Sequence, residues 1–317
     1  MRDNIDAWWV SCACSLTALN AQAEKCRAIN ALPPAAGNPP PAFEVLTFVA
    51  DGNKIMNSTH NRLRNPLKEK LARGEPVYSM TVRLVRTVDI ASIAYTAGFD
   101  SIYIDMEHSS FPLDAAGHIC MACIGLGVTP FVRVPSLDAH FIARVLDAGA
   151  LGIVAPSVQS AADARAVVRA AKHPPLGMRS VAGAAPQMNY RPLPSEETTR
   201  QLDDATMIIA MIESPEGLAA VDEIAAVEGV DILLVGASDL STSLGFPGQV
   251  DHPLVLDAYL RTLEACRAHN KVLGVGGLGG KPEFMKKLLS LGAQYVSTGN
   301  DVSFLVAAAT QKRMQFE

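Results

Sequence analysis

The stretch TMIIAMIESPEGLAAVDEIAAVEGVDILLVGASDL, residues 206–240, contains two apolar runs, each followed by a carboxylate and a helical pattern. The first carboxylate is Glu213 and the second is Asp239. Each run is typical of a buried strand, and the order strand–helix–strand favours a parallel α/β sheet. Such a sheet places both carboxylates at the carboxyl-terminal edge of neighbouring strands, where these proteins build their sites. Two oxygen ligands there predict a site for a divalent ion such as Mg²⁺ or Mn²⁺.

Outward from this stretch, strands and helices alternate from about residue 76 to the end of the chain. The strand-like runs are 76–84, 101–107, 130–135, 151–158, 207–213, 232–238, 272–278 and 295–299. Eight strands, each followed by a helix, predict a (β/α)8 TIM barrel, and the span is close to the ~250 residues typical of that fold. A doubly wound sheet is the alternative. It predicts a Gly-rich phosphate turn after the first strand, and residues 80–89, MTVRLVRTVD, contain none.

Composition limits the class of partner. The chain has 317 residues, of which 49% are hydrophobic and 19% charged, which is enough for a sizeable core. The net charge is −5 and there is no basic stripe, which argues against nucleic acid as a partner. No apolar run approaches the ~18 residues that a membrane helix needs. We therefore expect a partner that is a small molecule and expect no membrane association.

The cysteines indicate a reducing compartment. Three of the six lie near the amino terminus and three in helical patterns, so they form no disulfide framework, and we expect a cytoplasmic protein. Cys120 and Cys123 lie close to His118, which allows a zinc site as an alternative. We favour a buried helix face, because small thiols suit one and no second ligand pair follows at zinc-site spacing.

Two segments depart from the alternating pattern. Residues 1–57 include the run ALPPAAGNPPPAF and are expected to form an extension outside the barrel of residues 58–317, partly disordered. Residues 173–205 form a long connection, which we expect over the carboxyl-terminal mouth. Its Arg179, Asn189 and Tyr190 are candidates for a lid or a substrate contact. A surface excursion is the equally weighted alternative.

Several polar residues could carry chemistry. The second strand ends in Asp105, Glu107 and His108, the third carries Arg133, and the following helix carries Asp147. A histidine at a strand end is, taken alone, more often a capping or core residue. An arginine inside an apolar strand must meet an anion or several hydrogen-bond acceptors, because a buried unpaired guanidinium costs several kcal/mol. At a barrel mouth that anion is a carboxylate or a substrate oxyanion.

Backbone donors add to this set. The N–H groups around Gly236, Ala237 and Ser238 open a helical turn, and such a terminus binds anions. A cation, an arginine, a histidine and free amides together fit a small 2-oxo acid that chelates the metal. In this interpretation Arg133 and the metal stabilise an enolate oxygen, and His108 carries a proton with its tautomer fixed by a carboxylate such as Asp147.

These residues lie in motifs that resemble, in order, those of the HpcH/HpaI aldolase family of metal-dependent pyruvate aldolases. The motifs are IDMEHSS (104–110), VRVPS (132–136), RVLDAGA (144–150), IVAPSVQS (153–160), PLGMRS (175–180), IESPEGL (212–218) and VGASDLSTSLG (235–245). The family includes 4-hydroxy-2-oxoheptanedioate aldolase and, more distantly, macrophomate synthase. The resemblance covers roughly residues 60–317, and its specificity comes from motifs and spacings that agree together.

The resemblance implies a phosphoenolpyruvate/pyruvate-binding type of TIM barrel with a Mg²⁺, Mn²⁺ or Co²⁺ ion held by Glu213 and Asp239. It implies that Arg133 contacts the pyruvate oxygens. It also implies that the amides of Ala237 and Ser238 receive the pyruvate carboxylate.

For catalysis, the resemblance implies that His108 is the catalytic histidine and that Asp147 is its dyad partner. Asp105 matches an acidic residue of the second-strand motif. The family further implies that the last helix is exchanged between the subunits of a dimer and that dimers assemble into hexamers.

The chain also departs from the family. Met211 stands where relatives often have Gln, Ser136 stands where they often have Trp, and the stretch after GMRS differs. These changes leave the metal and enolate chemistry intact and bear on which electrophile is accepted.

We therefore predict a carbon–carbon lyase that cleaves a 4-hydroxy-2-oxo acid reversibly to pyruvate and an aldehyde. The strand ends named above carry no lysine, so enamine chemistry is disfavoured. Oxaloacetate decarboxylation, or a synthase reaction like that of macrophomate synthase, uses the same enolate and is the first alternative. A non-catalytic barrel is the second, and the presence of the metal and arginine residues disfavours it.

Overall fold

The computed structural model describes residues 62–317, so the extension expected over residues 1–57 lies outside the described residues. Within them, eight parallel strands close into a barrel in the order of the sequence. The strands are β1 (Val77–Val82), β2 (Ser101–Asp105), β3 (Thr129–Arg133), β4 (Gly152–Ala155), β5 (Met207–Ile212), β6 (Ile232–Gly236), β7 (Val272–Gly276) and β8 (Tyr295–Asn300). β1 pairs with β8 through Val77 and Tyr295, which closes the sheet. The predicted (β/α)8 barrel is confirmed, and an open doubly wound sheet is excluded.

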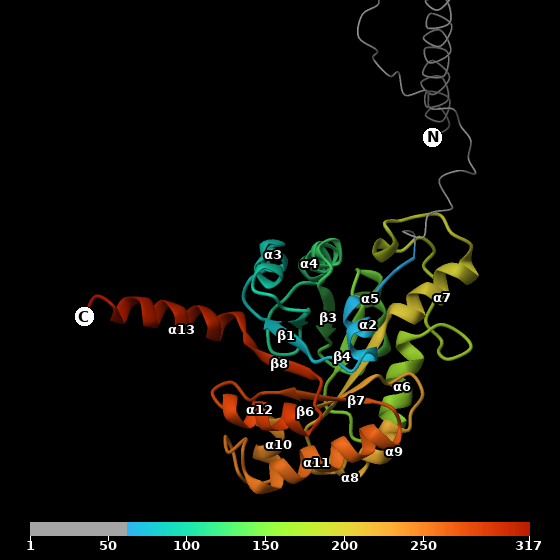
Figure 1. Cartoon of the computed structure of the whole chain (residues 1–317). Helices are drawn as coiled ribbons and strands as arrows, with labels where there is room; N and C mark the ends of the chain where they lie inside the picture. Colours follow the sequence, from blue (N-terminus) through green and yellow to red (C-terminus); the bar gives the residue numbers. More distant parts are fainter. Residues whose placement is uncertain (1–61) are drawn as a thin grey trace, which may run out of the picture. The chain divides into compact units, whose positions relative to one another are not determined.

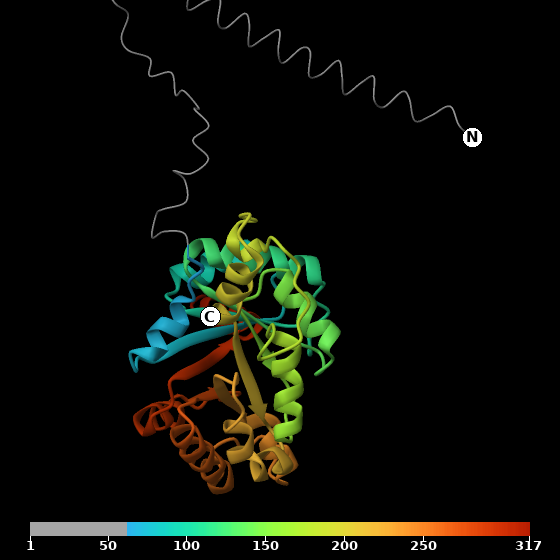
Figure 2. The same cartoon turned by 90° about the vertical axis from the view of Figure 1, so that its right-hand side faces the viewer.

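Most of the helices cover the outside of the barrel (Figures 1 and 2). The helices of the described residues are α2 (Pro66–Ala72), α3 (Asp89–Thr96), α4 (Leu113–Leu126), α5 (Ala139–Asp147), α6 (Ala161–Ala171), α7 (Ser195–Ala205), α8 (Pro215–Ala219), α9 (Val221–Ala225), α10 (Ala237–Ser243), α11 (Pro253–Ala268), α12 (Pro282–Leu291) and α13 (Asp301–Met314). None of these helices is both long and apolar enough to cross a bilayer.

The core has two layers, as the fold requires. One lies between the strands and the surrounding helices, and the other fills the barrel interior. Phe131 and Tyr295 meet edge to face inside the barrel, and Leu67 and Leu71 of α2 belong to the same cluster. α2 begins at Asn65, whose side chain accepts from the N–H of Lys68. This helix contributes to the floor of the barrel, so the opposite rim is left for a site.

The cysteines of α4 lie in the core. Cys120 and Cys123 are buried and free, and burial raises the pKa of the Cys123 thiol to about 12. No group of three or more His, Cys, Asp or Glu side chains suited to a metal occurs within residues 62–317. The core interpretation is therefore confirmed, and zinc at this helix is not supported.

The long connection of residues 173–205 differs from the prediction. It leaves the end of α6, contains the 3₁₀ turn η2 (Pro186–Met188) and α7, and then enters β5. A segment between a helix and the next strand lies on the amino-terminal side of the barrel. Asn189, for example, lines a pocket with Gly127 and Val128, which precede β3. The expectation that Arg179, Asn189 and Tyr190 cover the mouth of their own barrel is wrong. The connection follows helix α6 and not strand β4, so it begins at the amino-terminal end of the barrel.

The last helix projects from the barrel (Figure 1). Asp301 is the only buried residue of α13. Its carboxylate accepts hydrogen bonds from the backbone N–H groups of Arg83, Leu84 and Val85, at 3.0, 2.8 and 2.9 Å. These bonds tie the first residue of the last helix to the loop that follows β1.

Candidate active site

The centre of the rim is a buried ion pair between the ends of β2 and β3. Asp105 and Arg133 are register partners in the sheet. Arg133 donates from Nε and Nη2 to the two carboxylate oxygens of Asp105, at 2.9 and 2.7 Å. The Asp105 side chain is 0% exposed and that of Arg133 is 4% exposed. Burial alone would raise the pKa of Asp105, but the hydrogen bonds and charge of Arg133 outweigh it and hold that pKa below its ordinary value.

Residues after β2 wrap around this pair. The backbone N–H groups of Glu107 and His108 donate to Asp105, at 3.2 and 3.1 Å. The Glu107 Oε2 atom lies 2.9 Å from Nη1 of Arg133, an ion pair that lacks hydrogen-bond geometry. The His108 side chain is 53% exposed, and its Nε2 atom lies 3.7 Å from Glu107 Oε2. The imidazole is therefore open to solvent beside a carboxylate, where it can exchange a proton.

Glu213 lies at the same rim, directly after β5. Its Oε1 atom accepts from the backbone N–H of Ser157 at 2.6 Å and from the Ser157 hydroxyl at 3.1 Å. Its Oε2 atom is buried and has no hydrogen-bond partner among the described residues. Burial raises the pKa of Glu213, and the charges of Asp239 and Glu107 raise it further. A buried carboxylate oxygen without a donor is the kind of atom that a cation would satisfy.

Gly236 packs closely against that oxygen. A Cβ atom at Gly236 would lie 2.7 Å from Oε2 of Glu213, so any larger residue would intrude on the carboxylate. Asp239 follows three residues later in the first turn of α10 and is exposed. Because no three-residue ligand cluster occurs in the described part of the chain, a cation here would take its other ligands from substrate and water. That donor set fits Mg²⁺ or Mn²⁺, which often bind through one or two carboxylates.

The backbone amides at the start of α10 lie next to a glycine that has no side chain to cover them. Gly277 follows β7 with a φ of +73°, and a Cβ atom there would lie 3.0 Å from Ser238 Oγ and 3.4 Å from Ser238 N. A side chain at this position would be strained and would crowd the amide of Ser238. Ala237 is buried and Ser238 is exposed, so the amides lie at the edge of the rim.

Asp147 does not join this group within one chain. It ends α5, and its carboxylate accepts from Arg179 Nη2 at 2.7 Å. The Arg179 side chain is 3% exposed, and its Nε and Nη1 atoms have no partner among residues 62–317. The predicted contact between Asp147 and His108 is therefore absent from the protomer, because α5 carries Asp147 away from the end of β3.

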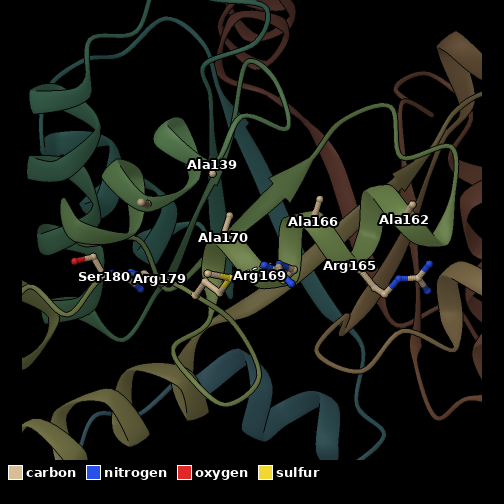
Figure 3. Close-up of a pocket in the computed structure, with 10 residues that line it drawn as sticks. Ala139, Ala162, Arg165, Ala166, Arg169, Ala170, Arg179 and Ser180 are labelled. Atoms are coloured by element: carbon tan, nitrogen blue, oxygen red, sulfur yellow. Dashed lines mark hydrogen bonds between the residues drawn. The ribbon is translucent and has the colours of Figure 1, made fainter.

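A groove lies apart from the rim, between α5 and α6 (Figure 3). Its volume is about 560 Å³, and it is lined by Ala139, Ala166 and Ala170 with Arg165 and Arg169 at its side. Met178, Arg179 and Ser180 line it too, and none of its lining residues is a carboxylate, a histidine, a cysteine or a lysine. The groove therefore does not compete with the carboxylates of the rim as a catalytic site.

Three residues of the rim escaped the sequence interpretation. Ser157 holds Glu213, Gly277 clears the amides of α10, and Arg83 donates from Nε to Asp105 at 2.6 Å. Their signals were faint. Ser157 sits within the family-like motif IVAPSVQS, Gly277 within a run of glycines, and Arg83 beside the end of a strand.

The comparisons with known proteins agree with this rim. Residues 84–308 match the model of the HpcH/HpaI aldolase/citrate lyase family. A 4-hydroxy-4-methyl-2-oxoglutarate aldolase of Hapsidospora irregularis is 38% identical over 252 residues, which cover 78% of this chain and 93% of the relative. A 2-keto-3-deoxy-L-rhamnonate aldolase of Escherichia coli is 33% identical over 255 residues, with 80% and 94% covered.

A solved structure agrees as well. The HpcH/HpaI aldolase from Desulfitobacterium hafniense DCB-2 superposes with a TM-score of 0.75 at 33% identity, covering 79% of this chain and 96% of that one. Motifs, fold and similarity over most of the chain point to one assignment. The chain belongs to the HpcH/HpaI aldolase/citrate lyase family, and it is an aldolase, a carbon–carbon lyase built on a (β/α)8 barrel.

Proposed function

We propose that the enzyme cleaves a 4-hydroxy-2-oxo acid reversibly to pyruvate and a second carbonyl compound, with a divalent cation held by Glu213 and Asp239. The observation that carries the proposal is the buried Oε2 atom of Glu213, which has no hydrogen-bond partner within the described residues and which packs against Gly236, where only a glycine fits. When bound, the cation supplies positive charge that stabilises an enolate oxygen. Mg²⁺, Mn²⁺ and Co²⁺ are the candidates.

Arg133 is proposed to stabilise the same enolate. Asp105 contacts the Nε and Nη2 atoms of its guanidinium, and Glu107 contacts Nη1, so the group is oriented before the substrate arrives. A donor that is already fixed costs no reorganisation when negative charge develops. Asp105 is thus a positioning residue in this proposal, because its contacts are with arginine side chains and backbone amides.

The backbone amides of Ala237 and Ser238 are proposed to bind the pyruvate carboxylate. The absence of a side chain at Gly277, where a Cβ atom would lie 3.4 Å from Ser238 N and 3.6 Å from Ala237 N, supports this role. With the carboxylate anchored there, the carbonyl oxygen of the substrate would face the carboxylates and Arg133.

His108 is proposed to take the proton of the 4-hydroxyl group. The bond between C3 and C4 then breaks, its electron pair forms the enolate, and protonation at C3 gives pyruvate. The exposed imidazole beside Glu107 suits this transfer. For Asp147 to fix the tautomer of His108, the two residues must come from different protomers, since Asp147 pairs with Arg179 in its own chain.

A homo-oligomer is part of the proposal. Large apolar residues of α13 are exposed in the single chain, among them Val302, Phe304, Leu305 and Val306. A helix with this surface requires a partner. Exchange of α13 between the subunits of a dimer, and assembly of dimers into a hexamer, would cover it. A cytoplasmic location also belongs to the proposal, and the free thiols of the described cysteines support it.

The substrate is proposed to be 4-hydroxy-4-methyl-2-oxoglutarate or a close analogue, because two relatives of 38% identity carry that name. The test is release of pyruvate from a panel of 4-hydroxy-2-oxo acids, with each metal and with EDTA, for wild type and Glu213→Gln. Metal-dependent release that the variant loses is expected. Equal release in EDTA would overturn the metal assignment, and no release from any acid would overturn the cleavage reaction.

Decarboxylation of oxaloacetate uses the same enolate as cleavage. A variant of His108 distinguishes the two reactions. Cleavage requires removal of the 4-hydroxyl proton, whereas decarboxylation does not. His108→Ala is therefore expected to reduce cleavage far more than decarboxylation, and equal loss of both would contradict the proton role.

A further inference from the structure

We propose that Arg83 binds the distal carboxylate of a dicarboxylic 2-oxo acid and is a specificity-determining residue of this aldolase. The inference rests on the proposed function and adds the residue that recognises the second carboxylate of the proposed substrate. It means that the preferred substrate carries a second negative charge beyond the carbon–carbon bond that is cleaved.

Arg83 has donors to spare at the rim. It follows the last residue of β1 and donates from Nε to Oδ2 of Asp105 at 2.6 Å. Its side chain is 35% exposed, and neither Nη atom has a partner within the described residues. Two terminal nitrogens of a guanidinium form the pair of parallel donors that a carboxylate accepts. One edge of Arg83 is therefore anchored, and the other is open to the mouth.

The two arginines that contact Asp105 differ in how many of their donor nitrogens have no partner. Arg133 is 4% exposed and uses Nε and Nη2 on Asp105 and Nη1 on Glu107. It is already committed to the buried part of the site. Arg83 approaches the same carboxylate from the side of β1 and remains half-buried. A substrate whose oxo group lies near Arg133 would extend its other end past Asp105 toward the free nitrogens of Arg83.

The backbone of Arg83 is fixed. Asp301 is buried, with 6% of its surface exposed. Its carboxylate accepts hydrogen bonds from three successive N–H groups, those of Arg83, Leu84 and Val85. A side chain that starts from a fixed backbone and is held at Nε has few conformations left to lose on binding. Such preorganisation favours a specific contact over a solvated, mobile surface charge.

The charge balance of the loop agrees. The carboxylates of Asp105 and Glu107 offset the guanidinium groups of Arg133 and Arg83. Arg86 is exposed, donates to Ser110 Oγ at 2.6 Å, and adds a positive charge that no carboxylate within the described residues pairs with. Asp301 adds a carboxylate to the same loop, so the three arginines and the three carboxylates balance, and the attraction for an anion is local to the open Nη atoms of Arg83.

The competing explanation is that Arg83 only neutralises Asp105. It predicts that loss of Arg83 harms every substrate alike, because Arg133 would then lose its support. The proposal predicts a selective loss, confined to ligands with a second carboxylate. The two are separated by a pair of ligands that differ only at the distal end.

The experiment measures binding of 2-oxoglutarate and of 2-oxopentanoate by calorimetry, with Mn²⁺ present, to wild type, Arg83→Gln and Arg83→Lys. The two ligands have the same chain length and differ by one carboxylate. Arg200→Gln is the matched control, since Arg200 is an exposed arginine paired with Glu197 on α7. Wild type is expected to prefer the diacid by about 10-fold or more, as hydrogen bonds to charged groups allow.

Arg83→Gln is expected to remove that preference while its affinity for 2-oxopentanoate stays within about threefold. Arg83→Lys, which keeps the charge, is expected to retain part of the preference. The proposal would be overturned if wild type showed no preference for the diacid, or if Arg83→Gln lost affinity for both ligands equally. Deuterium exchange at C3 of pyruvate reports on the enolate chemistry separately. Absence of exchange in the wild-type enzyme would refute the proposed function. Selective loss of diacid binding in Arg83→Gln tests the role of Arg83 independently, because binding is measured without turnover.

Discussion

Ser157 donates both its backbone N–H and its hydroxyl to one oxygen of Glu213, and the other oxygen of that carboxylate has no donor among residues 62–317. The serine thus fixes the carboxylate and orients its free oxygen at once. Residues that orient a metal-binding carboxylate in this way are usually worth 10- to 100-fold in metal affinity. The Ser157–Glu213 pair is the most direct support for a cation at the rim.

Ser157→Ala is expected to weaken Mn²⁺ binding by about 10-fold, because the hydroxyl donor is lost and the backbone donor remains. Calorimetric titration with Mn²⁺ measures this. Ser136→Ala is the control, since the one hydrogen bond of the Ser136 side chain within the described part of the chain is accepted from the N–H of Asp138. Unchanged affinity in Ser157→Ala would show that the hydroxyl does not orient Glu213.

Metal should also stabilise the fold. A ligand that binds only the folded state raises the free energy of unfolding by about 2.7 kcal/mol at a 100-fold excess over its dissociation constant. We expect Mg²⁺ or Mn²⁺ to raise the melting temperature of wild type and not that of Glu213→Gln. A rise of equal size in the variant would place the ion elsewhere.

The buried pair of Asp105 and Arg133 predicts a dependence of stability on acid. Asp105→Asn leaves a buried guanidinium without its partner, at a cost of about 3–5 kcal/mol of unfolding free energy near neutral pH. The pKa of Asp105 is lowered in the folded state, so its contribution is present above the unfolded pKa and is lost as pH falls through the folded one.

Urea titrations of wild type and Asp105→Asn from pH 7 down to about pH 3 measure the difference. The gap between the two proteins is expected to narrow below about pH 4. A gap that stays constant over this range would mean that the charge of Asp105 does not stabilise the fold.

Gly277 provides a local test of the amide site. Gly277→Ala places a Cβ atom 3.0 Å from Ser238 Oγ at a φ of +73°. We expect a raised KM and about 1 kcal/mol of lost stability from the strained backbone. Gly279→Ala is the matched control, because a Cβ atom there meets nothing within 4 Å. Equal kinetics for the two variants would argue against substrate at the amides of α10.

The exposed face of α13 predicts assembly. Leu305 is 60% exposed and lies in the middle of the helix. Leu305→Arg is expected to lower the mass in solution, measured by light scattering, because a charge would be buried without a partner. Lys312→Glu, near the end of the same helix, controls for a general effect of charge. A wild-type protein that runs as a monomer would contradict the proposed exchange.

Strand periodicity was enough to predict the barrel from the sequence. Each strand is short, apolar and followed by a helix, so the residues at the strand ends, Asp105, Arg133 and Glu213, fell on one rim. The strand pattern alone could not predict the position of residues that lie on the surrounding helices. Asp147 lies at the end of α5, and its position relative to His108 depends on how protomers assemble, which periodicity does not encode.

Arg83 and Ser157 show a second limit. Their roles come from contacts between segments far apart in the chain, Arg83 with Asp105 and Ser157 with Glu213. An arginine beside a strand end is usually a solvated charge, and a serine in a loop is usually a turn residue. Only the closed sheet, which brings β1 beside β2 and β4 beside β5, gives these residues their partners.

The contact of Asp301 with the β1 loop joins the last helix to the rim of the barrel. The residue that begins this exposed helix also holds the loop that carries Arg83. A substitution that reorients α13 to suit a new subunit arrangement would therefore shift the loop that, in our proposal, binds the far end of the substrate. We therefore expect changes of subunit arrangement and of acceptor preference to occur together among related enzymes.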